Sequence, residues 1–241
     1  MAGERRLRIL TRLVGSGAFG LETKKLCEVC AEVTGMSGAG IMLMADDLPS
    51  GAVCTTDKVS RLIEELQYTL GEGPCVDAYH QDRPVYEPNL AEPNAPRWTA
   101  FAVPAIAAGA RAVFGFPLQV GAVRLGALNL YRDQPGPMST EQHADALVMA
   151  DVSAAAVLMM QANAPPGKVA VELERGADFR YVVHQASGMV AVQLNVSIAQ
   201  AMIRLRGYSF GSDRPLTEVA GDVVARRLRF DAETGDIGSG P

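Results

Sequence analysis

Residues 112–131 read AVFGFPLQVGAVRLGALNLY, and this stretch decides the fold of the larger part of the chain. Two β patterns, 112–120 and 123–131, flank Gly121 and Ala122, which predicts a hairpin with a glycine at its turn. Upstream, an apolar run, a turn and a short strand pattern follow one another at 39–45, 46–51 and 52–55. Helical patterns lie at 21–34, 58–68 and 139–161. Strands in a run flanked by helices, with adjacent hairpin partners, predict an α+β sheet covered on one face by helices.

Composition predicts one mid-sized domain and one small one. The chain has 241 residues, of which 48% are hydrophobic. We expect a sheet-containing domain at 1–161, a linker at 162–177, a small helical domain at 178–230 and a tail at 231–241. Two prolines and a glycine in the linker restrict it and allow a bend. The tail is acidic and rich in glycine, so we expect it to be disordered.

The sequence shows no pattern of export, membrane insertion or metal binding. Its longest apolar stretch, 144–160, contains Asp145 and Asp151 and falls short of a spanning run of about 20 residues. We therefore expect a cytoplasmic protein whose four cysteines are reduced thiols. Cys27 and Cys30 have C-x-x-C spacing but lie inside a helical pattern without a second pair, and the histidines are scattered. The expectation is no metal and no cofactor.

Four segments of the larger part resemble the GAF domain family, over roughly residues 20–161. They are LCEVCAEVTG with GAGIML, TLGEGPCVDAY, RPVYEPNL and the closing hairpin. The resemblance implies a sensory module that binds a small molecule between its sheet and the connecting loops, or that serves mainly as a dimerisation platform. A pocket lid would then lie at 70–111. Since pockets are mostly apolar with a few placed polar groups, the predicted lining residues are Cys54, Cys75, Tyr79, Trp98, Phe101 and Phe114.

Three amphipathic helical patterns fill residues 178–230. The first runs from Phe179 to Leu194, and its Gly188 predicts the close approach of a neighbouring helix. Ser197 has the position of an N-cap for the second, which extends to Ser209. The third has an apolar stripe from Leu216 to Leu228, with three arginines beside its end. A helical wheel of the second pattern predicts that its arginines are exposed.

This segment is basic on an otherwise acidic chain. Residues 178–230 include seven arginines and four acidic residues, which gives this segment a net charge of +3. The rest of the chain therefore carries −8, since the whole chain has a net charge of −5. Modules that contact phosphate groups tend to show such an excess, because each arginine at a phosphate releases counterions. A solvated helical face without a ligand would show it as well.

The order HQASGM, SIAQAMIRLRGYSF and RPLTEVAGDVVARRL resembles the ANTAR family of RNA-binding antiterminator domains. The resemblance implies a small helical bundle that binds RNA hairpins, usually as a dimer. Guanidinium groups contact phosphates or guanine edges, and a tyrosine ring stacks on an unpaired base. The predicted RNA contacts are Arg204, Arg206, Tyr208 and Arg214.

Together these patterns predict a homodimeric, signal-responsive RNA-binding regulator that acts on transcription termination or translation initiation. Three alternatives remain open: a dimeric ligand-sensing module without RNA activity, a DNA-binding regulator, and a former RNA-binding domain retained as a dimer scaffold. The third helical pattern lacks the polar first turn of a helix that reads DNA bases. We expect no enzyme, because no nucleophile, base and stabilising group converge in the sequence. Thiol chemistry at Cys54 or Cys75 is the enzyme-like alternative.

Overall fold

The computed structural model describes residues 2–15, 23–45, 48–93, 97–162, 178–212, 214–231 and 237–239. It divides the chain into two compact units, one ending at Gly176 and one beginning at Ala177. We call them the sheet unit and the helical unit, and we describe each by itself. Most of the predicted linker, 163–177, lies outside the described residues.

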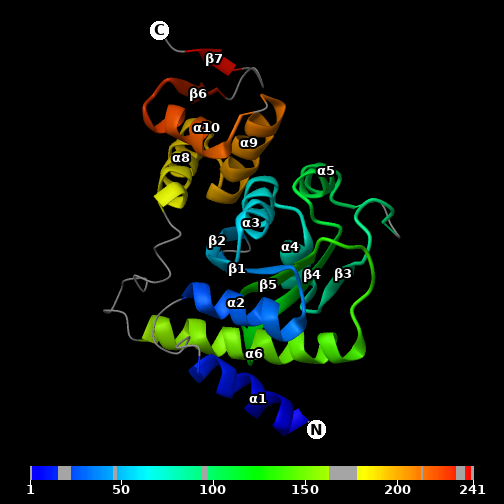
Figure 1. Ribbon diagram of the computed structural model, residues 1–241. Coiled ribbons are helices and arrows are strands. Elements are labelled where there is room, and N and C mark those ends of the chain that lie inside the picture. Colours follow the sequence, from blue (N-terminus) through cyan, green and yellow to red (C-terminus); the bar gives the residue numbers. More distant parts are fainter. Residues whose placement is uncertain are drawn as a thin grey trace. The chain divides into compact units, whose positions relative to one another are not determined.

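The sheet unit is built around one antiparallel sheet of five strands in the order β2-β1-β5-β4-β3 (Figure 1). The strands are β1 (Gly38–Ala45), β2 (Leu48–Thr55), β3 (Val85–Glu87), β4 (Ala112–Val120) and β5 (Val123–Arg132). The predicted hairpin of 112–131 is confirmed as β4 and β5, which pair from Ala112–Arg132 to Val120–Val123. β2 begins before the short strand predicted at 52–55.

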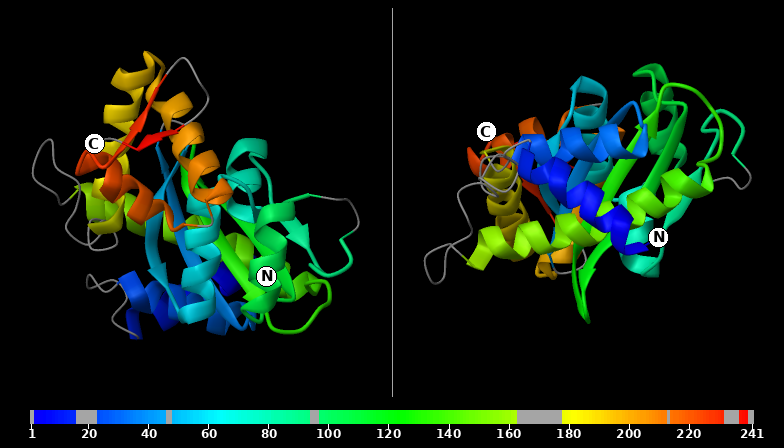
Figure 2. Two further views of the ribbon diagram at one scale, coloured as in Figure 1. Left: turned by 90° about the horizontal axis from the view of Figure 1, so that it is seen from above. Right: turned by 60° about the horizontal axis from the view of Figure 1, so that its bottom comes forward.

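Helices cover both faces of this sheet, so the prediction of cover on one face is wrong. Their bounds are α1 (Ala2–Gly15), α2 (Thr23–Thr34), α3 (Lys58–Leu70), α4 (Pro74–Gln81), α5 (Thr99–Ala107) and α6 (Thr140–Ala162). α2 and α6 pack on one face, with α1 outside them, and α3 and α4 pack on the other (Figure 1; Figure 2, right). The helix predicted at 58–68 is confirmed as α3, whereas α4 was missed, because it has only eight residues and begins soon after α3 ends.

The larger core lies between the sheet and the α2–α6 layer. Alternate residues of β4 and β5, such as Phe114, Phe116 and Leu128, meet α2 and α6 there. Length and hydropathy alone would let α6, or the bent pair of α8 and α9, span a membrane. Half of the most apolar window of α6 is buried inside the protein, as in a core helix. The absence of membrane contact stays a prediction.

A disulfide joins Cys27 of α2 to Cys54 of β2. The prediction of four reduced thiols is therefore wrong for this pair. Sequence spacing could not reveal it, because the two cysteines are 27 residues apart and meet only when α2 packs on the edge of the sheet. Cys30 and Cys75 are buried and unbridged.

The helical unit contains α8 (Asp178–Leu194), α9 (Ile198–Gly211) and α10 (Leu216–Val224), which pack on one another. Ser197 is confirmed as the N-cap of α9, within a capping box that includes Gln200. Gly188 does not mark a close helix approach, since a Cβ there would meet no atom within 4 Å.

The end of the helical unit differs from the predicted third helix. α10 ends at Val224, four residues before Leu228, because Arg226 adopts a left-handed conformation with φ of 61°. Leu228–Phe230 forms β6, which pairs antiparallel with β7, Ile237–Ser239. The tail thus contains a short strand where we expected disorder, while residues 232–236 lie outside the described part of the chain.

Candidate functional site

A buried polar cluster lies between the sheet and the α3–α4 layer. Its members are Glu64 and Gln67 of α3, Cys75 of α4 and Asn129 of β5, and we call them the polar cluster. Asn129 donates from Nδ2 to Oε1 of Glu64 at 2.8 Å, and the Cys75 amide donates to Oε1 of Gln67 at 2.7 Å. The four residues are between 0 and 3% exposed.

Two glycines give the cluster its room. A Cβ at Gly40 of β1 would collide with the Glu64 carboxylate, and one at Gly73 would lie 2.6 Å from Cγ of Gln67. Gly73 also has φ of 132°, a conformation that side chains rarely adopt. The backbone is therefore shaped around Glu64 and Gln67, and their burial is a built feature of this fold.

Three polar atoms of the cluster have no hydrogen-bond partner within the described residues. They are Oε2 of Glu64, Oδ1 of Asn129 and Nε2 of Gln67. Each such buried group costs about 1–3 kcal/mol, so the cluster is destabilising as it stands. The gap beside Glu64 and Asn129 is too small for a water molecule. The cluster presents one carboxyl oxygen, one amide acceptor and one amide donor, but it is closed.

Burial controls the protonation of the cluster. Desolvation raises the pKa of Glu64 from 4.5 to about 8, although the bond from Asn129 opposes the change. Glu64 is therefore mostly uncharged at neutral pH. Desolvation and the nearby Glu64 raise the pKa of Cys75 well above its usual range. Desolvation likewise raises the pKa of Cys30 to about 12. Both thiols stay protonated near pH 7, and Cys54 is bridged, so the thiol chemistry considered for Cys54 and Cys75 lacks a thiolate.

The structure distributes the six predicted pocket residues over separate places. Only Cys75 belongs to the polar cluster. Tyr79 packs under Arg124, whose guanidinium lies 4.8 Å from the ring centre. Trp98 and Phe101 contact each other edge to face, with 6.1 Å between ring centres, and Trp98 Nε1 donates to Asp77. Phe114 faces the other side of the sheet, as described below, and Cys54 is bridged to Cys27.

Sequence reasoning missed Glu64, Gln67 and Asn129, although a signal for two of them was present. Ser60, Ile63, Glu64 and Gln67 share the buried face of α3 at steps of three and four residues. A glutamate inside such a stripe marks a buried carboxyl group. Asn129 has no comparable signal, because strand alternation alone does not reveal which face it occupies.

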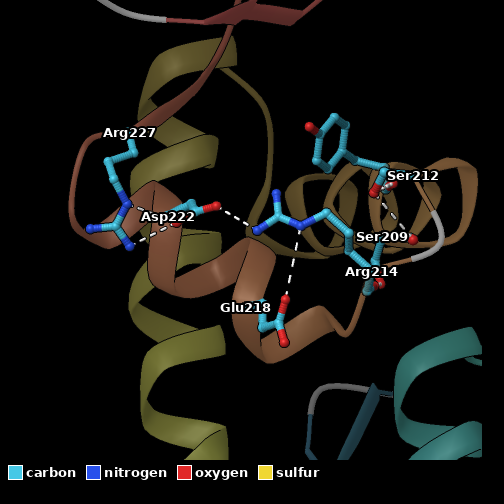
Figure 3. Close-up of polar contacts among 7 residues, drawn as sticks. Ser209, Ser212, Arg214, Glu218, Asp222 and Arg227 are labelled. Atoms are coloured by element: carbon cyan, nitrogen blue, oxygen red, sulfur yellow. Dashed lines mark hydrogen bonds and ion pairs between the residues drawn. The ribbon is translucent and has the colours of Figure 1, made fainter.

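In the helical unit, Asp222 of α10 binds two arginines (Figure 3). Arg214 donates to Oδ2 of Asp222 at 2.6 Å, and Arg227 donates from Nε to Oδ1 at 2.9 Å. Arg214 also lies 4.0 Å from Glu218. The hydrogen bonds from Arg214 and Arg227 lower the pKa of Asp222. Ser209 Oγ donates to the Arg214 carbonyl at 2.6 Å and so fixes the turn that carries this arginine.

The four predicted RNA contacts differ in their exposure. Arg204 is exposed, whereas Arg206 is only 8% exposed, so the prediction that the arginines of α9 are exposed is wrong for Arg206. The buried face of α9 is wider than its apolar stripe and includes Arg206 beside Met202 and Ser209. Tyr208 is half-buried, with its ring 5.7 Å from that of Phe230. Tyr208 also contributes to raising the pKa of Arg214, after Asp222, so these two residues lie together.

Other groups are exposed on the helical unit. Arg226, Arg227 and Arg229 follow α10, and all three are exposed. Ile203 and Phe210 of α9 are 62% and 64% exposed. The sequence placed Arg226 and Arg227 at the end of a helix, whereas they lie in the turn that leads to β6.

A model of the GAF domain family matches residues 23–157, more than half of the chain. Among solved structures, the chain is similar to the GAF domain of an Acinetobacter phosphoenolpyruvate-protein phosphotransferase, with 12% identity, a TM-score of 0.48, and coverage of 68% of this chain and 96% of that one. The corresponding domain from Coxiella burnetii has 13% identity and a TM-score of 0.48, with coverage of 67% of this chain and 95% of that one. A type II free methionine-R-sulfoxide reductase from Thermoplasma acidophilum has 17% identity and a TM-score of 0.42, with coverage of 55% of this chain and 87% of that one. No curated protein matches the chain.

Proposed function

This chain belongs to the GAF domain family, and from that premise we propose that it is a signal-responsive RNA-binding regulator. The sheet unit senses a small molecule at the polar cluster. The helical unit binds RNA hairpins and so controls transcription termination or translation initiation. We further propose that the protein is cytoplasmic and acts without catalysis.

The observation that carries the sensing role is the set of three unpartnered polar atoms in the polar cluster. A ligand that hydrogen-bonds to the Glu64 carboxyl group at Oε2, donates to Asn129 Oδ1 and accepts from Gln67 Nε2 would remove the cost of leaving them unpaired. The closed gap means that such a ligand binds only when the layer that contains α3 and α4 moves away from the sheet. Ligand binding then favours an open arrangement, which is the two-state behaviour that a sensor needs.

The RNA role rests on the ANTAR resemblance of residues 178–230 and on the exposed arginines of the helical unit. Arg204 and Arg226 are exposed, and they replace Arg206 as the expected phosphate contacts. Tyr208 is half-buried, so only part of its ring is available to stack on a base. The affinity of arginine contacts with RNA phosphates should fall as the salt concentration rises, because such contacts release counterions.

One alternative function has support of its own. A ligand-sensing module without RNA activity is favoured by the burial of Arg206 and by the use of Arg214 and Arg227 within the protein, where Asp222 binds both. In that case the basic residues of the helical unit stabilise its fold, and the partner is a second copy of the chain or another protein.

The dimer part of the proposal draws on exposed apolar side chains in the α1–α6 layer. Leu7 of α1 is 67% exposed, and Leu147 and Met159 of α6 are 41% and 54% exposed. Sedimentation at micromolar concentration should show a dimer, and Leu147→Glu should shift it toward the monomer. A monomer for the unmodified chain, with and without RNA, would contradict this part.

The RNA proposal is tested by titrating the full-length protein with a labelled hairpin pool and with duplex DNA at two salt concentrations. We expect selective, salt-sensitive hairpin binding that Arg204→Ala and Arg226→Ala each weaken. Arg61→Ala, at an exposed arginine of α3, is the matched control and should bind as the unmodified chain does. No hairpin binding at about 10 μM protein would leave the ligand-sensing alternative. Arg206→Ala is unsuitable, because truncating a buried side chain also tests folding.

A further inference from the structure

A second hollow lies on the face of the sheet opposite to the polar cluster. Its volume is about 330 Å³. Residues of β3, β4, the segment before α6 and the first turn of α6 line it, and we call it the aromatic hollow: Tyr86, Pro88, Phe114, Pro137, Met138, Ser139, Thr140 and His143. Binding sites for small molecules typically begin at about 300 Å³, so it has the size of a ligand site.

The sheet and its helix layer explain why this hollow exists. α2 packs on β1 and β2, and α6 packs on β4 and β5. β3 lies at the edge of the sheet, and Tyr86 pairs with Phe114 in register, so both side chains point to the α6 side. Tyr86 is nevertheless 39% exposed, unlike the fully buried Phe114. The helix layer thus leaves the β3 edge partly open.

Aromatic rings form one wall of the hollow. The Tyr86 ring lies 6.3 Å from Phe114 and 5.9 Å from Phe116, centre to centre, and 5.8 Å from His143. A hydrogen bond of 3.0 Å between the Tyr86 hydroxyl and Nδ1 of His143 fixes both rings. A ring that is held in place and partly exposed offers a flat apolar surface, against which another ring stacks with little loss of entropy.

The rim of the hollow is polar and favours negative charge. At the start of α6, the Ser139 hydroxyl accepts from the Gln142 amide at 3.2 Å and so caps the helix. The Thr140 hydroxyl and the amides of Thr140 and Glu141, which have no acceptor one turn earlier in the helix, are the groups that would meet a ligand there. Arg132 holds the segment before α6 in place, since it donates to the Pro137 carbonyl and to Gln142. The acidic residue of the first turn, Glu141, is bound by Arg5, which compensates its charge.

From these walls and this rim, we propose that the aromatic hollow binds a small planar aromatic carboxylate. The ring stacks on Tyr86, and the carboxylate accepts hydrogen bonds from the first turn of α6. The site is separate from the polar cluster and independent of the RNA proposal. Because α6 also packs against α1 and α2, a ligand at its first turn contacts the layer that we propose for dimerisation.

Three probes separate the two parts of this recognition in the full-length protein. 2-Naphthoate carries both the ring and the charge, cyclohexanecarboxylate lacks the aromatic ring, and 2-naphthalenemethanol lacks the charge. We expect 2-naphthoate to bind with a Kd below about 1 mM, at least tenfold tighter than the other two. Proton NMR of the His143 ring should follow the titration, with the resonance assigned through His143→Gln.

Two variants and a control complete the test. Tyr86→Ala should weaken 2-naphthoate binding at least tenfold, whereas Tyr181→Ala, at a tyrosine of α8 that is 74% exposed, should leave it unchanged. Thr140→Asp places a negative charge at the start of α6, which suits the helix dipole and preserves folding. It should weaken 2-naphthoate but not 2-naphthalenemethanol. Equal binding to the unmodified chain and to Tyr86→Ala, or no binding of 2-naphthoate at millimolar concentration, would overturn the proposal.

Discussion

Replacing Glu64 with glutamine should remove a large part of the pH dependence of the stability of the sheet unit. The carboxyl group ionises near pH 4.5 when exposed to water, but in the folded protein its pKa is about 8. A raised folded pKa means that the contribution of the group to stability is complete below pH 4.5 and is lost as the pH rises to about 8. Each pH unit within this window costs about 1.4 kcal/mol, so the whole window costs up to about 5 kcal/mol.

Glutamine keeps the shape of the side chain and cannot ionise. Between pH 5.5 and pH 8, the free energy of unfolding of the unmodified chain should therefore fall by more than that of Glu64→Gln. The difference should reach up to about 3.5 kcal/mol. Urea unfolding measures this difference through the fluorescence of Trp98, which is the single tryptophan of the chain and is buried in the sheet unit. All other titrating groups are common to both proteins and cancel in the comparison.

Glu65 is the matched control, because it neighbours Glu64 on α3 but is exposed. Glu65→Gln should follow the unmodified chain at every pH. Parallel stability curves for the unmodified chain, Glu64→Gln and Glu65→Gln would refute the reasoning, since Glu64 would then be ionised in the folded protein throughout the window.

Three further predictions concern backbone, disulfide and charge. Gly188→Ala should stabilise the helical unit by about 1 kcal/mol in thermal unfolding, since the methyl group meets no neighbouring atom; a loss of stability would indicate a close approach after all. Reduction of the Cys27–Cys54 disulfide should cost about 3.5 kcal/mol for a separation of 27 residues, and the Cys27→Ser/Cys54→Ser double variant should be indifferent to reductant. Asp222→Asn should loosen Arg214 and Arg227 and so tighten hairpin binding, with a steeper salt dependence; unchanged affinity and slope would mean that neither arginine reaches RNA.

The fold of the sheet unit could be predicted where local patterns determine it. The hairpin of 112–131 has a two-residue turn between alternating strands, and the structure reproduces its bounds within one residue. The second helix layer and the Cys27–Cys54 disulfide depend on contacts between segments far apart in the chain, which no local pattern encodes. The same holds for the end of α10, because the apolar Leu228 continues the helical spacing but belongs to β6.

The candidate sites were predictable to a smaller extent. Apolar and aromatic residues were chosen as pocket walls, and most of them fill the core instead, because the residues that line a pocket and those that fill a core have the same composition. The polar cluster consists of residues that such a search passes over. Helical periodicity predicts the position of Arg206 around α9, but it does not predict how wide a face of α9 is covered by α8 and α10. Arg206 is buried because that face is wider than the apolar stripe.

Opening of the polar cluster must involve α3, α4 and α5 together. Side-chain contacts join these helices to one another: Gln67 with the Cys75 amide, Trp98 with Asp77, and Glu72 with the amides of Ala100 and Phe101. These contacts lie within the layer. Between the layer and the sheet, Asn129 donates to Glu64, Arg124 to the Tyr79 carbonyl, and Cys75 Sγ to the Ala127 carbonyl. Tyr131 also donates to Asp57, the N-cap of α3. Ionisation of Glu64 adds the cost of a buried charge to the closed state and none to an open, hydrated one. Rising pH and a hydrogen-bond-donating ligand should therefore favour the same movement of this layer away from the sheet.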